Sequence, residues 1–382
     1  MDNALQLLKQ LVAVDSVNPS LVPGAAGEAA VGRTIAEAMR QMGLAVEIQD
    51  VAPGRPNVVG TLQGRAAGRS LMFCGHIDTV GVTAMNAPFN PVEKDGRIYG
   101  RGSQDMKSGI AAMIDAAGVI AESGGLAAGL IVIACVVDEE HASIGADALV
   151  TRWRADGAVV TEPTDLQVAI AHKGFEWVEV ETEGRAAHGS RPREGRDAIR
   201  LMARVLMGLD AVDRRLQSGA SHPLLGTASL HASLIEGGRE LSSYPDRCHL
   251  QMERRTIPGE APGAALREVE DLLARLRVED ADFKGACKSM FARSPYEIAA
   301  DHALPQAMLR ALGTLAPSHP RTAAPIGMSF WTDAAILGDA GIPSILFGPT
   351  GAGLHSVEEW VDARSVLTCR DALVALARDF CR

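Results

Sequence analysis

Residues 71–81, LMFCGHIDTVG, begin as an apolar strand and then place a histidine and an aspartate two positions apart, at His76 and Asp78. Side chains alternate between the two faces of an extended chain, so residues two apart point to the same side. An aspartate in that position can support a neighbouring histidine that binds a metal ion. A polar loop at the end of a strand explains this stretch equally well on its own.

Helical and strand patterns alternate around this first strand. Residues 107–125 have helical periodicity and end in a glycine pair, and residues 129–137, GLIVIACVV, have the apolar pattern of a second buried strand. A helix between two such strands forms a right-handed crossover, which makes the strands parallel. We therefore expect an α/β fold with a mixed, mostly parallel sheet that is flanked by helices.

The chain is long enough for two domains, since 382 residues exceed what one core usually supports. Its character changes near residue 175, where an alternating strand begins and is followed by amphipathic helices and further strands. Buried strands and helices return after about residue 290. We expect one body from residues 1–174 and 291–382, and an inserted α+β domain from residues 175–290.

The composition argues against several classes of protein. With 47% hydrophobic and 22% charged residues, the chain is typical of soluble globular enzymes, and its longest apolar run, residues 127–137, is too short to cross a bilayer. The start lacks the features of a secretory signal, and six scattered cysteines without short paired spacings favour a reducing cytoplasm. The net charge of -10 without a basic patch argues against nucleic acid and anionic membranes as partners.

Five places in the outer body share one feature: acidic or histidine residues directly follow an apolar run or a glycine-rich turn. In open α/β sheets, ligands bind beyond the carboxyl ends of the strands, where these residues should fall. Each residue has a structural alternative, such as a helix cap for the aspartate or a local hydrogen bond for a loop histidine. Their convergence favours a shared site. The residues are His76 with Asp78, Asp105, the pair Glu139 and Glu140, Glu162, and His355.

Imidazole and carboxylate ligands without thiolates suit zinc, with cobalt or manganese as substitutes. The sequence offers more ligands than the three that one catalytic zinc ion uses, so two ions are expected. Asp105 would bridge the two ions through its two oxygens, since it is the only aspartate in the set. The five ligands are His76, Asp105, Glu140, Glu162 and His355.

The adjacent glutamates are expected to divide the work, because neighbouring residues point in different directions. Glu140 would bind a metal ion, and Glu139 would face a water shared by the two ions. As general base, Glu139 would take a proton from this water while it attacks a carbonyl, and would return the proton to the leaving amine. The predicted reaction is hydrolysis of an amide.

Eight motifs carry a resemblance to a known family: GHIDTV, GRGSQDMKSG, VDEEHASIGA, TEPTD, AHKG, GRAAHGSRPREGRDAI, ERRTIPGE and GLHSVEEWV. From about residue 5 to the end, the chain resembles the acetylornithine deacetylase, succinyl-diaminopimelate desuccinylase and carboxypeptidase G family of zinc metallopeptidases and deacylases. The resemblance implies that Asp78 supports His76 and that Glu139 is the base. It assigns one ion to His76, Asp105 and Glu162, and the other to Asp105, Glu140 and His355.

The resemblance also implies that the inserted domain is a lid that forms a homodimer. His188 matches a histidine that stabilises the oxyanion of the partner's tetrahedral intermediate, although by itself it reads as a loop histidine. Arg255 matches a lid arginine that binds a substrate carboxylate, where a surface ion pair is the alternative. Ser242 stands where relatives usually have an asparagine, which leaves the substrate contact at that position open.

We expect a cytoplasmic dizinc amidohydrolase that removes the acyl group from a small N-acylated amino acid. A metallo-carboxypeptidase or dipeptidase that cleaves short peptides by the same chemistry is the alternative. A non-catalytic metal-binding protein is disfavoured because it would not need Glu139. A nucleotide-binding oxidoreductase is disfavoured because residues 100–105, GRGSQD, lack the third glycine of the dinucleotide fingerprint. The acyl group, the amino acid and the native metal are left open.

Overall fold

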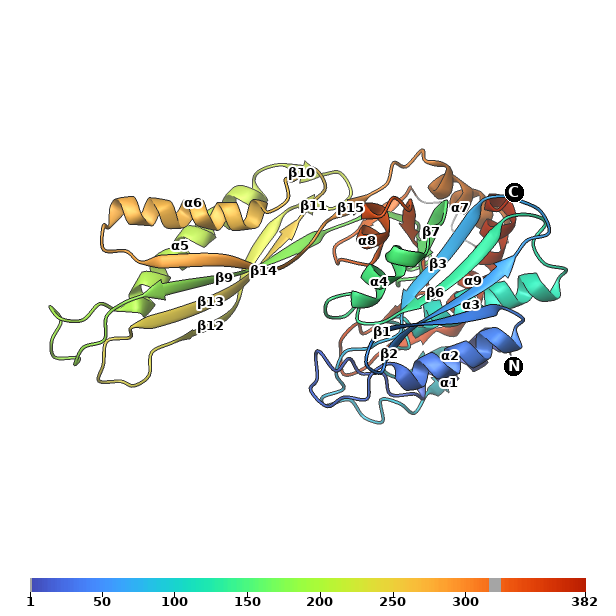
Figure 1. Ribbon diagram of the computed structural model, residues 1–382, viewed down its shortest axis with the longest axis horizontal. Helices are drawn as coiled ribbons and strands as arrows, with labels where there is room; N and C mark the ends of the chain where they lie inside the picture. The colour runs from blue at the N-terminus through green and yellow to red at the C-terminus, as the bar shows by residue number, and fades with distance from the viewer. Residues whose placement is uncertain (1, 316–323) are drawn as a thin grey trace. The chain divides into compact units, whose positions relative to one another are not determined.

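The computed structural model describes residues 2–315 and 324–382. The chain divides into two compact units (Figure 1). Unit 1 comprises Met1–Ile170, Ile298–Ile326 and Thr332–Arg382, and unit 2 comprises Ala171–Glu297 and Gly327–Trp331. The inserted domain that we propose from the sequence, residues 175–290, falls within the range of unit 2.

A mixed sheet forms the centre of unit 1. The four strands in its middle, β6, β3, β7 and β17, are parallel, whereas the strands on either side join antiparallel. The predicted mixed α/β sheet is confirmed, and its parallel part is the middle of the sheet. Among the described residues the order is β1 (Ala45–Ala52), β2 (Arg55–Gln63), β6 (Leu130–Val136), β3 (Ser70–His76), β7 (Gly157–Val160), β17 (Ser344–Leu346) and β8 (Ala169–His172). The end of β8 pairs with β15 (Tyr296–Glu297), and these paired residues fall within the range of unit 2. β16 (Ile326–Met328) also pairs with β8.

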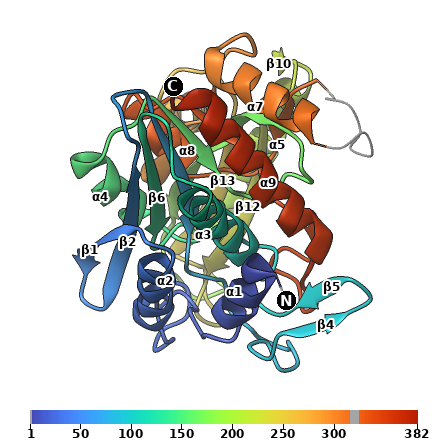
Figure 2. The same cartoon turned by 90° about the vertical axis from the view of Figure 1, so that its right-hand side faces the viewer.

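Helices cover the sheet of unit 1. The crossover helix α3 (Lys107–Glu122) packs against α1 (Asn3–Val12) and α9 (Ala363–Phe380), as Figure 2 shows. Thirteen of the sixteen residues of α3 are buried, because its many alanines and glycines let other elements approach it from several sides. The remaining helices are α2 (Ala29–Gln41), α4 (Ile144–Arg152), α7 (Ala303–Thr314) and α8 (Ala334–Asp339).

A small antiparallel sheet in unit 1 joins two loops that are far apart in the sequence. Its order is β18 (Gly351–Ala352), β19 (Trp360–Asp362), β5 (Arg97–Tyr99) and β4 (Val92–Lys94). Trp360 pairs with Tyr99, so the loop that precedes β19 lies beside the loop that follows β5.

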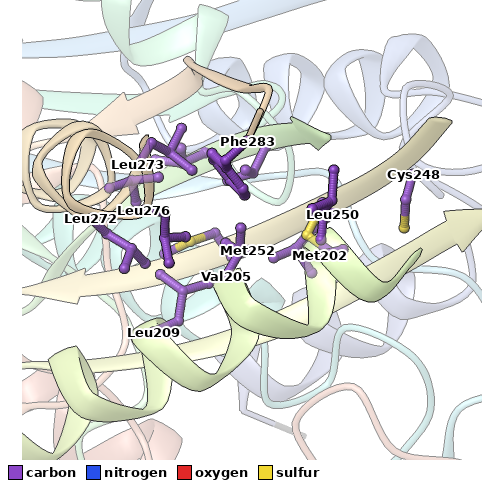
Figure 3. Packing of buried hydrophobic residues seen from close by; sticks show 14 of the residues in the cluster. Met202, Val205, Leu209, Cys248, Leu250, Met252, Leu272, Leu273, Leu276 and Phe283 are labelled. Carbon is purple, nitrogen blue, oxygen red and sulfur yellow. The ribbon is translucent and has the colours of Figure 1, made fainter. Parts of the chain in front are cut away.

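Unit 2 is an α+β domain. Its antiparallel sheet has the order β12 (Ser229–Gly237), β13 (Arg247–Thr256), β9 (Gly174–Glu183) and β14 (Gly285–Arg293), beside the short pair β10 (Ser221–His222) and β11 (Gly226–Thr227). Helices α5 (Ala198–Gln217) and α6 (Ala264–Glu279) pack on this sheet. Figure 3 shows their shared core, in which Val205, Leu272 and Met252 come from α5, α6 and β13.

Within the described part of the chain, no helix is long and apolar enough to span a membrane.

Candidate active site

Three neighbouring strands of the unit 1 sheet end at one edge and carry the predicted residues there. His76 is the last residue of β3, Glu139 and Glu140 follow β6, and Glu162 follows β7. Because β6, β3 and β7 are parallel, their carboxyl ends meet. This edge is the usual ligand position in such a sheet.

Two further residues come from loops. Asp105 lies just before α3, and a Cβ atom at Gly109 in the first turn of α3 would lie 2.1 Å from the Thr161 carbonyl oxygen. Only glycine allows this approach, which brings the start of α3 against the strand end that carries Glu162. His355 lies in the loop between β18 and β19.

Asp105 lies between two histidines. Its Oδ1 is 3.1 Å from Nε2 of His76, and its Oδ2 is 3.4 Å from Nε2 of His355. His76 Nε2 is also 3.8 Å from Glu162 Oε1, and His355 Nε2 is 3.0 Å from Glu140 Oε2. Each imidazole therefore faces one oxygen of a shared carboxylate and one further carboxylate, a pattern that can hold two cations.

The donor atoms are close enough to bind metal. In two sets, His76 with Glu139 and Glu162, and His76 with Asp105 and Glu140, all donor atoms lie within 4.8 Å of one another. Glu139, which we expect to be the base, is thus near enough to act as a ligand. The cluster is a candidate metal-binding site.

Asp78 contacts both His76 and the turn that follows β6. The Asp78 carbonyl oxygen is 3.0 Å from Nδ1 of His76, closer than its carboxylate oxygen at 3.6 Å. With Nδ1 donating to that carbonyl, Nε2 keeps a lone pair that could bind a metal ion beside Asp105. The Asp78 carboxylate instead accepts the backbone N–H groups of Glu139 and Glu140, at 3.1 and 3.2 Å.

A buried charge network supports Asp78 from behind. Asn18 Nδ2 donates to Asp78 at 2.7 Å and to Asp138 at 3.1 Å. The Arg55 guanidinium pairs with Asp138 at 2.8 Å and with both carboxylate oxygens of Glu28. Asp138 has a left-handed backbone, with φ of 71°, and starts the turn that carries the glutamate pair. Sequence reasoning missed these residues, because a polar residue in an ordinary segment gives no sign of a distant partner.

The buried carboxylates of the cluster favour the binding of cations. Burial raises the pKa of Glu139 and of Glu162 well above the ordinary range, and burial with the charge of Asp105 raises that of Glu140. Hydrogen bonds to Asp105 and Glu140 raise the pKa of His355 to about 10. Glu140 Oε1 is buried without a hydrogen-bond partner among the described residues. Buried, crowded carboxylates of this kind are stabilised by bound cations, so the residues present fit a two-ion centre.

Two predicted residues belong to unit 2. His188 is exposed, its Nδ1 is 2.8 Å from Ser190 Oγ, and it accepts the Ser190 N–H. Arg255 donates from Nε to Glu253 at 2.6 Å, and its guanidinium lies 5.6 Å from the centre of the Phe175 ring. The cluster in unit 1 thus unites the other predicted residues, whereas these two have contacts of their own in unit 2.

Comparisons with known proteins agree with a hydrolytic metal site. Residues 72–379 match the sequence model of peptidase family M20/M25/M40. The acetylornithine deacetylase of Proteus mirabilis is 29% identical over 99% of this chain and 96% of its own length. The N-formyl-4-amino-5-aminomethyl-2-methylpyrimidine deformylase of Bacillus subtilis is 28% identical over 96% of this chain and 92% of its own.

A solved structure shares the fold. The YXEP protein of Bacillus subtilis, a dinuclear metal-binding peptidase, superposes with a TM-score of 0.73 over 98% of this chain and 97% of its own, at 16% identity. At that identity the likeness concerns the fold alone.

Proposed function

The chain belongs to peptidase family M20/M25/M40 and is a metal-dependent hydrolase, and on that premise we propose that it removes the acyl group from an N-acylated amino acid with two zinc ions. The observation that carries the proposal is the pair of Asp105 oxygens, which face His76 at 3.1 Å and His355 at 3.4 Å. A carboxylate so placed can serve two ions at once.

Five side chains would hold the two ions. His76, Asp105 and Glu162 would bind one, and Asp105, Glu140 and His355 the other. When bound, the ions would polarise the substrate carbonyl and acidify a water. Cobalt or manganese suits the same donors.

Glu139 is proposed as the proton carrier. It takes one proton from the water whose oxygen bonds to the carbonyl carbon, and it gives that proton to the amine nitrogen as the C–N bond breaks. The acyl group then leaves as a carboxylate and the amino acid as an amine. Burial raises the pKa of Glu139, which makes its carboxylate a stronger base toward the proton of the water. Glu140 is engaged by His355 at 3.0 Å, which supports the division of roles.

Two residues of unit 2 are proposed for substrate and transition state. Ser190 engages Nδ1 of His188, so Nε2 is the nitrogen that would donate to the oxyanion. Glu253 engages Nε of Arg255, so the two terminal nitrogens are the atoms that would bind the substrate carboxylate.

A homodimer through unit 2 is supported by its edge strand. β12 ends the sheet and exposes Leu234 to 66% and Ile235 to 56%, and Met207 on the nearby α5 is 75% exposed. An open strand edge with apolar side chains favours pairing with a second copy. We propose a cytoplasmic location, for which the six free cysteines are suited.

A substrate panel tests this function. Purified protein with added zinc or cobalt is assayed for amine release from N-acetyl and N-formyl amino acids and from dipeptides of the same residues. We expect the acyl amino acids to react faster. Faster cleavage of the dipeptides would instead favour the carboxypeptidase or dipeptidase alternative, and no hydrolysis of either class would contradict the proposal.

A further inference from the structure

Glu359 is a buried carboxylate that accepts several hydrogen bonds from the loop carrying Asp105. It is 1% exposed and directly precedes β19. Its Oε1 accepts the backbone N–H groups of Gln104 at 2.8 Å and Asp105 at 3.0 Å. Its Oε2 accepts the N–H of Gly102 at 3.0 Å and Nη1 of Arg101 at 2.6 Å. Four donors from one short loop thus converge on one side chain.

The loop can converge in this way because of a glycine. Gly102 has φ of +80°, a conformation that side chains rarely adopt. A Cβ atom there would lie 2.9 Å from Cγ2 of Thr79 and 3.0 Å from Cδ of Lys107. The tight turn directs its backbone N–H groups toward Glu359.

Arg101 links Glu359 to the segment that carries His355. Its Nη2 donates to the carbonyl oxygens of Ser356 at 2.8 Å and of Gly81 at 3.2 Å. Ser356 is the neighbour of His355, so the pair of Glu359 and Arg101 ties together the two loops that carry Asp105 and His355.

Burial does little to hold the side chain of His355. The His355 side chain is 56% exposed and its backbone is left-handed, with φ of 57°. Burial therefore contributes little to its position, and the polar contacts of the segment matter more.

We infer that Glu359, acting through Arg101 and the loop N–H groups, is a positioning residue that holds Asp105 and His355 at the spacing needed to bind a metal ion together with Glu140. Both Glu359 oxygens are occupied by protein donors, so its role is to place ligands. The inference rests on the proposed metal site, and residues that orient metal ligands typically contribute about 10- to 100-fold to affinity.

Glu359→Gln is the sharpest change. The glutamine keeps the size of the side chain, but one acceptor oxygen becomes an NH2 group that faces backbone or guanidinium donors. Asp115→Asn is the matched control. Asp115 lies on α3, is 2% exposed, and pairs through its carboxylate with Arg370 on α9 at 3.2 Å. Arg101→Lys is the second variant, because a lysine keeps the charge beside Glu359 but lacks the fork that reaches Ser356.

The experiment is a cobalt titration of the metal-stripped full chain, followed by visible absorption and calorimetry. The wild-type protein and Asp115→Asn are expected to bind about two ions per chain. In Glu359→Gln the affinity for the more weakly bound of the two ions should fall about 10- to 100-fold. The midpoint of thermal unfolding of the metal-free protein should be close to that of Asp115→Asn. Excess cobalt should restore turnover.

Contrary results are distinguishable. If Glu359→Gln binds two ions as tightly as the wild-type protein, or if Asp115→Asn loses the same step, the inference is wrong. If Glu359→Gln does not fold, wild-type affinity in Arg101→Lys would overturn it, and a weakened step there would support it. If the wild-type protein binds no cobalt at all, the proposed function itself fails.

Discussion

The Asp78 carboxylate accepts the backbone N–H of Glu139 at 3.1 Å. The residue two positions after His76 therefore fixes the start of the turn that carries the glutamate pair, and its carbonyl oxygen orients the His76 ring at 3.0 Å. Asp78 thus links His76 on β3 to the residues after β6. A substitution of Asp78 should therefore affect residues at the ends of two strands.

Asp78→Asn tests this link. The amide would place an NH2 group against the N–H of Glu139 or Glu140, so both glutamates should shift. We expect turnover to fall about 10- to 100-fold, as for other residues that orient metal ligands. Steady-state kinetics and metal content measure the effect. The same change at the exposed Asp50 on β1 serves as the control, and equal turnover in the two variants would contradict the role of Asp78.

Glu139→Gln separates a base from a ligand. If Glu139 carries the proton, turnover should fall about 100- to 10,000-fold while the protein still binds two metal ions. If it belongs to the donor set with His76 and Glu162, the metal content should fall as well. Metal analysis beside single-turnover rates distinguishes the two outcomes. Glu37→Gln, on the exposed side of α2, is the control.

Arg55→Met should be strongly destabilising. It would leave the buried carboxylates of Glu28 and Asp138 without their cation, at a cost of about 3 to 5 kcal/mol in the free energy of unfolding. Urea unfolding of the metal-free protein measures this cost. Arg152→Met removes an exposed ion pair with Glu47 instead and should cost no more than about 1 kcal/mol. Similar costs in the two variants would contradict the importance of burial.

His172 should make stability depend on pH. Burial lowers its pKa in the folded protein to about 4, against 6.5 as the ordinary value, even though Nδ1 lies 2.9 Å from the Lys173 carbonyl oxygen. Between these values the unfolded chain binds the proton more readily, so stability falls as the pH drops from 6.5 to 4. The full effect is about 3 kcal/mol, since one pKa unit corresponds to about 1.4 kcal/mol.

His172→Phe isolates this contribution from the other titrating groups. The stability of the wild-type protein relative to the variant should decline between pH 7 and pH 4.5, as measured by chemical unfolding at each pH. A constant difference across that range would show that His172 does not titrate differently on folding.

Leu234→Lys tests the edge strand β12. A charge at this 66% exposed position should prevent a second copy from pairing there, so light scattering should show a monomer. If His188 acts across the dimer, activity should fall with it. Val278→Lys, at an 89% exposed position on α6, should leave both properties unchanged. A dimer that survives Leu234→Lys would place the interface elsewhere.

Local pattern was informative wherever a strand ended in a polar residue. The apolar run before His76 and the run before Glu139 both predict strands, and parallel neighbours must present their carboxyl ends on one edge. The helix expected at 107–125 is α3, Lys107–Glu122, and its glycine pair lies just beyond its end. The mixed α/β class could therefore be predicted from pattern, whereas the metal-dependent hydrolase family was predicted from the resemblance that the motifs carry.

The return of residues 327–331 to unit 2 could not be predicted in this way. The segment that ends in Trp331 has no strong periodicity, and its place is decided by contacts such as the donation from Trp331 Nε1 to the Ser294 carbonyl oxygen at 3.1 Å. A short segment of this kind follows its partners, which the local sequence does not reveal.

The sequence by itself determined where several strands and helices lie along the chain and which polar residues follow them, because these features depend on short-range sterics and on the spacing of apolar residues. Only the tertiary structure decided which buried charges meet. Arg55 reaches Asp138, and Glu359 reaches Arg101, across long stretches of chain. A charge can be buried only where a partner from elsewhere in the chain compensates it, so these pairings depend on the whole fold.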